Sequence, residues 1–161
     1  MPLSLRQDAA EFARPLARDF KGTRIAWLGD FGGYLPFEPG VLDLCRDSLK
    51  VFESLGCVVA AATPDYPLDR VWSNWLKLRA WQVGALLKDL YRDPANRELM
   101  KPELRWEIES GLKVSAFDVA DASVVRTSWY QAVCALFKHY DFLVAPAGPV
   151  FPFDATIPWP K

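Results

Sequence analysis

The sequence predicts a small α/β domain with a three-stranded, mainly parallel sheet of order 2-1-3 flanked by helices. Three short apolar runs, at residues 24–28, 57–62 and 142–145, have the length and composition of buried strands. Between them, apolar side chains recur at steps of three and four, which is typical of helices. Parallel strands joined by a right-handed crossover take the order 2-1-3 most simply. We expect the 161 residues to form a single domain, 1–161.

The first element expected is a short helix over residues 7–19. Its apolar residues Phe12, Leu16 and Phe20 recur at roughly helical intervals, although Pro15 interrupts the pattern. The first strand follows.

A loop and a helix are expected after the first strand. The segment 30–40 is rich in glycine and proline, which predicts a loop. A helix over 39–55 follows, because Pro39 suits a first helical turn and Gly56 suits a left-handed helix end.

The rest of the chain is predicted from the same kinds of signal. Asp93 and Pro94 should end the long helix, because a residue before proline disfavours helical backbone. The tail 146–161 is rich in proline and is expected to be irregular. The remaining elements are a strand over 57–62, a long helix over 68–91, a helix over 101–110, a helix from a capping box at Ser115 to about His139, and a strand over 142–145.

Composition excludes several classes of partner. The 19 basic and 20 acidic residues give a net charge of −1 and form no basic stripe, so we expect no nucleic-acid partner. No apolar run is long enough to span a bilayer, so no membrane contact is expected. Three scattered cysteines are typical of a reduced, cytoplasmic protein.

Candidate catalytic groups are few. A serine triad would have to use His139, the single histidine, which sits at a predicted helix end and is interpreted as a structural or surface residue. Cys134 lies about 140° away from it around the same helix, so the two form no dyad. No metal-ligand spacing occurs, and the run from Gly29 to Gly33 lacks the GxGxxG order, so we expect no metal and no cofactor.

Aromatic residues leave two interpretations open. Trp72, Trp75, Trp106 and Trp129 form either an aromatic binding wall or, as we expect, packing within a core or an interface. The high apolar content likewise indicates either a well-filled core or a partner surface.

Four stretches, taken in order, resemble the amidase-signature hydrolases. They are RIAWLGDFGG at 24–33, the segment 43–64 with LGCVV before ATP, FKHYDFLVAP at 137–146, and FPFD at 151–154. The resemblance covers almost the whole chain and implies an amidase-signature-like subdomain from the C-terminal half of the family fold.

The resemblance also implies that the catalytic residues of the family are absent from this sequence. The family uses a serine nucleophile, a bridging serine in a cis peptide and a lysine, all upstream of the region matched here. No serine of this sequence lies in such a glycine- and serine-rich signature. We therefore expect no catalytic residue, and interpret the chain as an amidase-family (C–N amide hydrolase) fragment that is inactive alone, either a remnant or one part of a split amidase.

In the family, the segment after the last matched strand lies near the substrate pocket. By this resemblance, the residues expected at a substrate pocket are Pro146, Ala147, Gly148 and Phe151. The family commonly has threonine where this chain has Ala147. The expected partner is either a second copy of the chain, which would form a homodimer, or the missing catalytic half of an amidase. The alternatives are a free-standing module that binds a small ligand or self-associates, and an enzyme of unrelated chemistry that uses Cys134 or His139.

Overall fold

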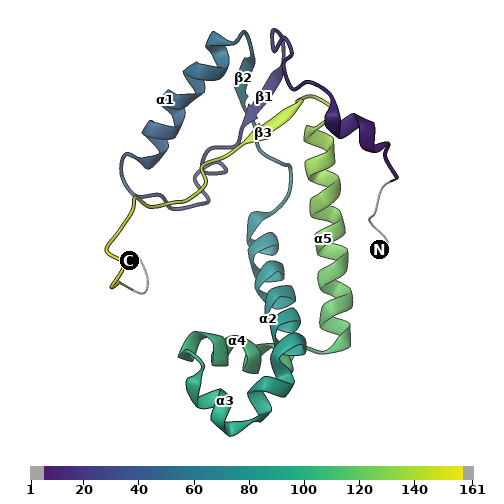
Figure 1. The fold of residues 1–161 in the computed structure, drawn as a ribbon, viewed down its shortest axis with the longest axis vertical. Helices are drawn as coiled ribbons and strands as arrows, with labels where there is room; N and C mark the ends of the chain where they lie inside the picture. The colour runs from purple at the N-terminus through teal and green to yellow at the C-terminus, as the bar shows by residue number, and fades with distance from the viewer. Residues whose placement is uncertain (1–5, 158–161) are drawn as a thin grey trace.

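The computed structural model describes residues 6–157, which form a sheet lobe and a helical lobe (Figure 1). The sheet lobe holds the strands β1 (Arg24–Trp27), β2 (Val58–Ala61) and β3 (Phe142–Val144), with the helix α1 (Val41–Ser54). The helical lobe holds α2 (Leu68–Arg92), α3 (Pro94–Leu99), α4 (Pro102–Leu112) and α5 (Ala116–Leu136). The segments 62–67 and 137–141 connect the two lobes.

The sheet is parallel with the order β2-β1-β3, which confirms the predicted fold class and strand order. In the central strand, Ile25 lies opposite Val59 on one side and Phe142 on the other. Ile25 and Ala26 are almost completely buried. The apolar run that predicted this strand therefore forms the centre of the sheet.

Helix α1 lies along β2 and packs its apolar stripe inward, with Val41 and Leu49 buried (Figure 1). Gly56 follows it with a left-handed φ of 83°, as predicted. A β-carbon there would lie 3.2 Å from the Cα of Lys21, so both the backbone angle and the close approach favour glycine.

In the helical lobe, α2 packs closely against α4 and also against α5. Gly84 and Gly111 face each other where α2 and α4 cross, beside the fully buried Ile108. A β-carbon on Gly111 would lie 1.8 Å from the carbonyl oxygen of Ala80, so the backbones of α2 and α4 leave no room for a side chain at this position. The capping box predicted at Ser115 is present at the start of α5.

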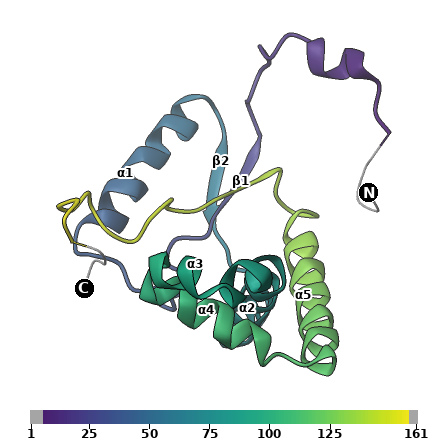
Figure 2. The ribbon, with the colours of Figure 1, turned by 60° about the horizontal axis from the view of Figure 1, so that its bottom comes forward.

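The helix predicted over residues 7–19 is wrong. Only a 3-10 turn over Ala9–Ala13 forms, and the following residues run extended to Phe20. Pro15 removes a backbone donor. Phe12 and Leu16 are 77% and 92% exposed, so no packing supports a helix. This N-terminal arm leaves the body on the side opposite the C-terminal tail (Figures 1 and 2).

Two further features of the helical lobe were not predicted. Asp93 ends α2 as expected, but Pro94 opens a further helix, α3. Proline suits a first helical position, and the Asp93 carboxylate accepts a hydrogen bond from the Ala95 amide at 3.0 Å. Helix α5 ends at Leu136, short of His139, in a turn closed by hydrogen bonds to the Leu136 carbonyl.

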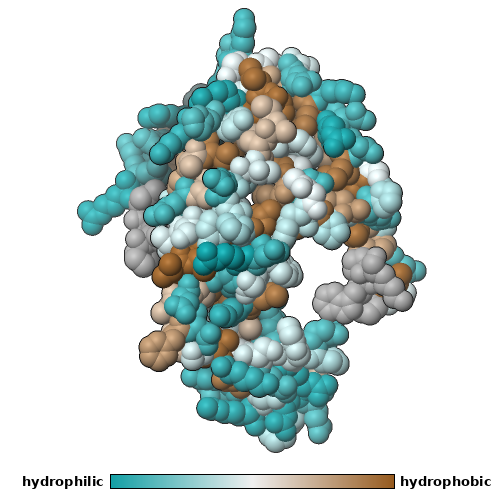
Figure 3. All heavy atoms as spheres, turned by 180° about the vertical axis from the view of Figure 1, so that it is seen from behind, coloured by the Kyte–Doolittle hydropathy of each residue, from teal (hydrophilic) through white to brown (hydrophobic). Residues whose placement is uncertain are grey.

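The molecule exposes much more surface than a compact monomer. Its accessible area is 12442 Å², whereas a compact protein of 18.2 kDa exposes about 8,100 Å². Apolar residues, brown in Figure 3, reach the surface at several places on the face shown. No helix among residues 6–157 is long and apolar enough to cross a membrane.

Candidate functional site

Because the strands are parallel, the segments that follow them gather at one edge of the sheet. These segments are 28–40 after β1, 62–67 after β2 and 145–157 after β3. Open α/β sheets bind ligands at this carboxyl edge. We therefore take it as the candidate functional site.

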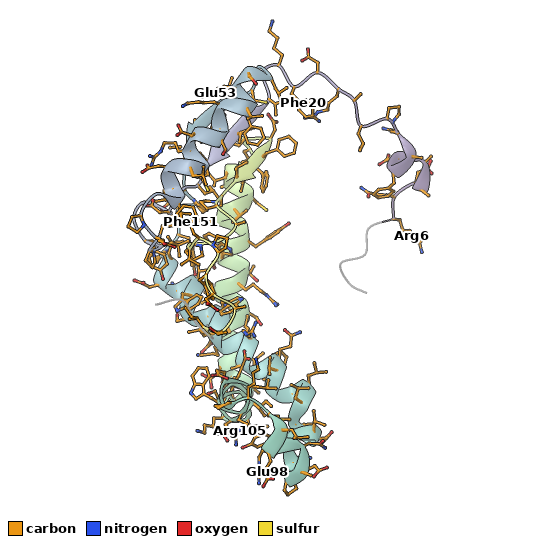
Figure 4. The ribbon with its side chains drawn as sticks, turned by 60° about the vertical axis from the view of Figure 1, so that its left-hand side comes forward. Arg6, Phe20, Glu53, Glu98, Arg105 and Phe151 are labelled. Atoms are coloured by element: carbon orange, nitrogen blue, oxygen red, sulfur yellow. The ribbon has the colours of Figure 1, made fainter. Side chains whose placement is uncertain are left out.

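Two hydrogen bonds join the loop after β1 to the tail after β3. The Glu38 amide donates to the Pro149 carbonyl at 2.8 Å, and the Phe151 amide donates to the Glu38 carboxylate at 2.8 Å. The Phe151 ring also lies near Gly40. Figure 4 shows Phe151 beside the start of α1. The tail has no helix or strand as far as residue 157, yet Glu38 holds it against the loop after β1.

All four residues predicted at a pocket lie on this tail. Pro146 is half-buried, while Ala147 and Gly148 are exposed, and a β-carbon on Gly148 would meet nothing within 4 Å. Phe151, 37% exposed, is the member that contacts another segment. Substrate contact by these four residues stays a prediction. Residues 158–161 of the predicted tail lie outside the described residues.

A hollow of about 410 Å³ with a mixed polar and apolar lining lies where β1 and β2 end. Its charged groups have partners already: the Asp30 carboxylate accepts a hydrogen bond from the Gly33 amide at 3.0 Å, and Arg46 pairs with Asp43 at 3.0 Å. Gly32 and Gly33 adopt left-handed backbone angles, so the glycine run forms a tight turn, as predicted. Within residues 6–157, no three His, Cys, Asp or Glu side chains are placed to hold a metal ion.

The loop after β1 also lines an aromatic cavity of about 280 Å³. It takes residues from the loop after β1, from α2 and from α5. Its lining residues are Phe31, Tyr34, Leu35, Leu68, Val71, Trp72, Trp75 and Trp129.

The aromatic cavity unites three of the four tryptophans that the sequence singled out. Trp106 is not among its lining residues and instead lines a groove between α2 and α4. Sequence reasoning missed Phe31 and Tyr34. They sit in a loop without periodicity, and only the tertiary structure brings that loop against α2.

The structure does not bring together His139 and Cys134, the two residues considered for chemistry unrelated to the amidases. His139 is exposed in the turn after α5, and no hydrogen bond joins it to Cys134 in the described structure. The neighbour of Cys134 is Tyr130, one turn earlier, and the Cys134 thiol raises the pKa of that phenol by hydrogen bonding. Among the described residues, the geometry therefore gives Cys134 no histidine base.

No family model matches the chain, whereas comparison with known proteins finds similar ones. An acylamidase from Rhodococcus erythropolis is 29% identical over 163 residues, which cover 98% of this chain and 33% of that protein. The crystal structure of a bacterial aryl acylamidase of the amidase-signature enzymes superposes with a TM-score of 0.79 and 22% identity. That match covers 94% of this chain and 32% of the other, and it shows that the two share a fold over this region. The chain is thus similar to an acylamidase, has the fold of the matching part of an amidase-signature enzyme, and spans about a third of the length of each.

Proposed function

We propose that residues 1–161 form a non-catalytic part of an amidase-type hydrolase of C–N amide bonds. It acts together with a catalytic region that lies outside these residues. The observation that carries the proposal is the similarity to an acylamidase over 98% of this chain and 33% of that protein. In this arrangement the carboxyl edge, with Pro146 to Phe151, walls the pocket beside the catalytic groups.

The serines of this chain are committed to local structure. Amide hydrolysis needs an activated nucleophile and donors for the oxyanion. Most serine hydroxyls here donate to carbonyls of their own helix, and Ser115 caps α5. The serines bonded to their own helix are Ser48, Ser54, Ser73, Ser123 and Ser128. The Ser115 hydroxyl also donates to the Asp118 carboxylate at 2.6 Å, and with a pKa lowered to about 2 this carboxylate is a weak base. These contacts support a non-catalytic role for the six serines.

The exposed area supports a large partner. The excess over a compact monomer is about 4,300 Å². An ordinary protein interface covers about 800 Å² on each partner, so one such contact leaves most of the excess exposed. A region that covers several faces, such as the remainder of an amidase fold, fits this excess better than one copy of the chain.

A chimera tests the proposal. Residues 1–161 replace the matched third of the Rhodococcus erythropolis acylamidase, and hydrolysis of an anilide is measured. We expect measurable turnover, lower than in the parent enzyme. A chimera that folds, and whose serine reacts with a fluorophosphonate, but that shows no turnover would contradict the proposed contribution to the pocket.

The isolated chain gives the complementary test. Incubation with the same fluorophosphonate, followed by intact-mass measurement, should leave residues 1–161 without an adduct. No anilide or aliphatic amide should be hydrolysed. An adduct on any serine, with turnover lost on its replacement by alanine, would show that the chain is itself a hydrolase.

A further inference from the structure

We propose that the aromatic cavity binds a methylated ammonium group, such as the trimethylammonium group of choline. The cavity is the one defined above, between the loop after β1, helix α2 and Trp129 of α5. The inference goes beyond the proposed function, because it concerns binding by this chain and holds whether or not the chain contributes to amide hydrolysis.

Aromatic rings make up most of the lining of the cavity. Five of the eight lining residues carry one, and they come from the loop after β1, from α2 and from α5: Phe31, Tyr34, Trp72, Trp75 and Trp129. The face of an aromatic ring carries partial negative charge, so it attracts a cation within about 6 Å of its centroid, and tryptophan attracts most strongly. Rings that line one space from three elements therefore favour a cation over an uncharged group of the same shape.

One of these rings already attracts a cation of the chain itself. Trp72 and Trp75 stack with their centroids 5.1 Å apart and stay 55% and 47% exposed. The Arg79 guanidinium lies 5.3 Å from the centroid of Trp75. Arg79 lines a hollow between α2 and α5 that shares Trp75 and Trp129 with the cavity, but it does not line the cavity. The eight lining residues include no charged side chain, so the cavity is left to a cation from outside.

A carboxylate at the cavity supplies the opposite charge. The Tyr34 hydroxyl donates a hydrogen bond to Asp69, and burial followed by this contact raises the pKa of Tyr34, so the phenol stays protonated at neutral pH. Among the described residues Asp69 forms no ion pair, whereas the charge of Arg79 is balanced by Glu107. The Asp69 charge is therefore available to attract a cation bound beside Tyr34.

The lining offers few hydrogen-bond acceptors, which favours a cation that carries no N–H group. A primary ammonium has three donors and a guanidinium has five, and each donor left without a partner costs free energy. The indole N–H groups of the lining only donate, and the Tyr34 phenol already donates to Asp69. The other lining residues that lack a ring are aliphatic: Leu35, Leu68 and Val71. A quaternary ammonium enters such a lining without losing a hydrogen bond.

The volume of the cavity fits this group. An apolar cavity of about 150 Å³ is sufficient for benzene, which is similar in bulk to a trimethylammonium group. The cavity here, at about 280 Å³, leaves room for the group and the first carbons of the chain attached to it.

The test is a titration of residues 1–161 with choline, followed through the indole N–H resonances by NMR. We expect saturable shifts at Trp72, Trp75 and Trp129. 3,3-Dimethylbutanol, which has the same shape without the charge, should bind about tenfold more weakly. Raising the salt concentration from about 10 to about 500 mM should weaken the binding of choline more than that of the alcohol. Absence of saturation by choline, equal binding of the alcohol, or choline binding that does not respond to salt would each overturn the proposal.

A pair of substitutions at Leu35 separates charge from shape. Leu35 is an exposed loop residue that lines the cavity. Leu35→Glu should strengthen choline binding about threefold and Leu35→Lys should weaken it by about the same factor, because the added charges act on the bound cation with opposite sign. A purely structural effect would change the affinity in the same direction in both variants, and that result would contradict the proposal.

Two further pairs locate the site. Asp69→Asn should weaken choline binding about fivefold, whereas Asp89→Asn, at an exposed aspartate near the other end of α2, should leave it unchanged. Trp72→Ala should weaken it about tenfold. Trp81→Ala is the control, because Trp81 is an exposed tryptophan on α2 that does not line the cavity. Equal effects within either pair would place the choline elsewhere, and the Leu35 variants keep the test decisive if Trp72→Ala does not fold.

Discussion

Arg24 and Asp141 bind each other through both backbone and side chain at the amino end of the sheet. The Arg24 amide donates to the Asp141 carboxylate at 2.8 Å, and its guanidinium lies 3.4 Å from both carboxylate oxygens. In return, the Asp141 amide donates to the Arg24 carbonyl at 2.8 Å. This reciprocal pair fastens β3 to β1.

Replacing Asp141 by alanine should lower the melting temperature, since the Arg24 amide and guanidinium lose their acceptor. The Arg24 amide, and then its side chain, lower the pKa of Asp141 in the folded state. The stabilisation is therefore complete above the unfolded pKa of about 3.9 and disappears as the pH falls through the lower folded value. Melting curves at pH 7 and below pH 3 check this. Asp43→Ala, which breaks an exposed pair within one helix, should have a much smaller effect at pH 7.

Gly111→Ala should destabilise the protein by about 3 kcal/mol or more, because the added methyl group collides with the Ala80 carbonyl at the crossing of α2 and α4. The greater helix propensity of alanine, about 1 kcal/mol, is too small to offset this. Urea unfolding measures the difference. Gly148→Ala is the control, since its β-carbon meets open space. Similar stabilities for the two variants would show that α4 can move away from α2.

Asp118 links the capping box of α5 to α2. The Ser115 hydroxyl and amide, followed by Lys77, lower its pKa to about 2. A depressed folded pKa gives stability that is present above the unfolded value of about 3.9 and is lost as the pH falls to about 2. The difference in melting temperature between wild type and Asp118→Asn should therefore be fully present at pH 6 and shrink as the pH falls through about 2. A difference that persists unchanged at pH 2 would contradict this assignment.

Glu38→Ala should loosen the tail after β3, because the Phe151 amide loses its acceptor. Hydrogen exchange resolved to single amides should show faster exchange at Phe151 and little change in α2. Glu53→Ala, an exposed glutamate at the other end of α1, is the matched control and should leave Phe151 protected. Equal exchange in both variants would mean that the tail is held by other contacts.

The exposed apolar surface should make the isolated chain associate. Light scattering coupled to size-exclusion chromatography should give a mass above 18.2 kDa that rises with concentration. Phe12 and Leu16 on the N-terminal arm are the first residues to test, and their replacement by serine should reduce the mass if the arm takes part. A clean monomer at every concentration would contradict self-association, including the homodimer that the sequence led us to expect.

The sheet was predictable because its signals are local. Apolar runs bounded by glycine and proline define each strand, and a right-handed crossover leaves one simple order for β1, β2 and β3. The N-terminal arm was predicted wrongly for the opposite reason. Its spacing of apolar residues is roughly helical, but a short helix forms only where it can pack, and Phe12 and Leu16 have nothing to pack against.

The site was only partly predictable. The tryptophans were recognisable as a group, yet the sequence does not show that Trp129 of α5 meets Trp72 and Trp75 of α2, while Trp106 of α4 lines a different groove. The role of Glu38 as the anchor of the tail depends on a contact 113 residues along the chain. Such distant contacts leave no periodicity that a reader of the sequence can use.

The strand order β2-β1-β3 has a consequence for synthesis on the ribosome. The central strand β1 receives its second neighbour only when the chain reaches Asp141, 117 residues after Arg24. At about 5–20 residues per second, translation leaves one side of β1 unpaired for roughly 6–23 s. During this interval the nascent chain presents the unpaired edge of an apolar strand to its surroundings, so the segment that later forms the middle of the sheet is open to chaperones and to pairing with other strands.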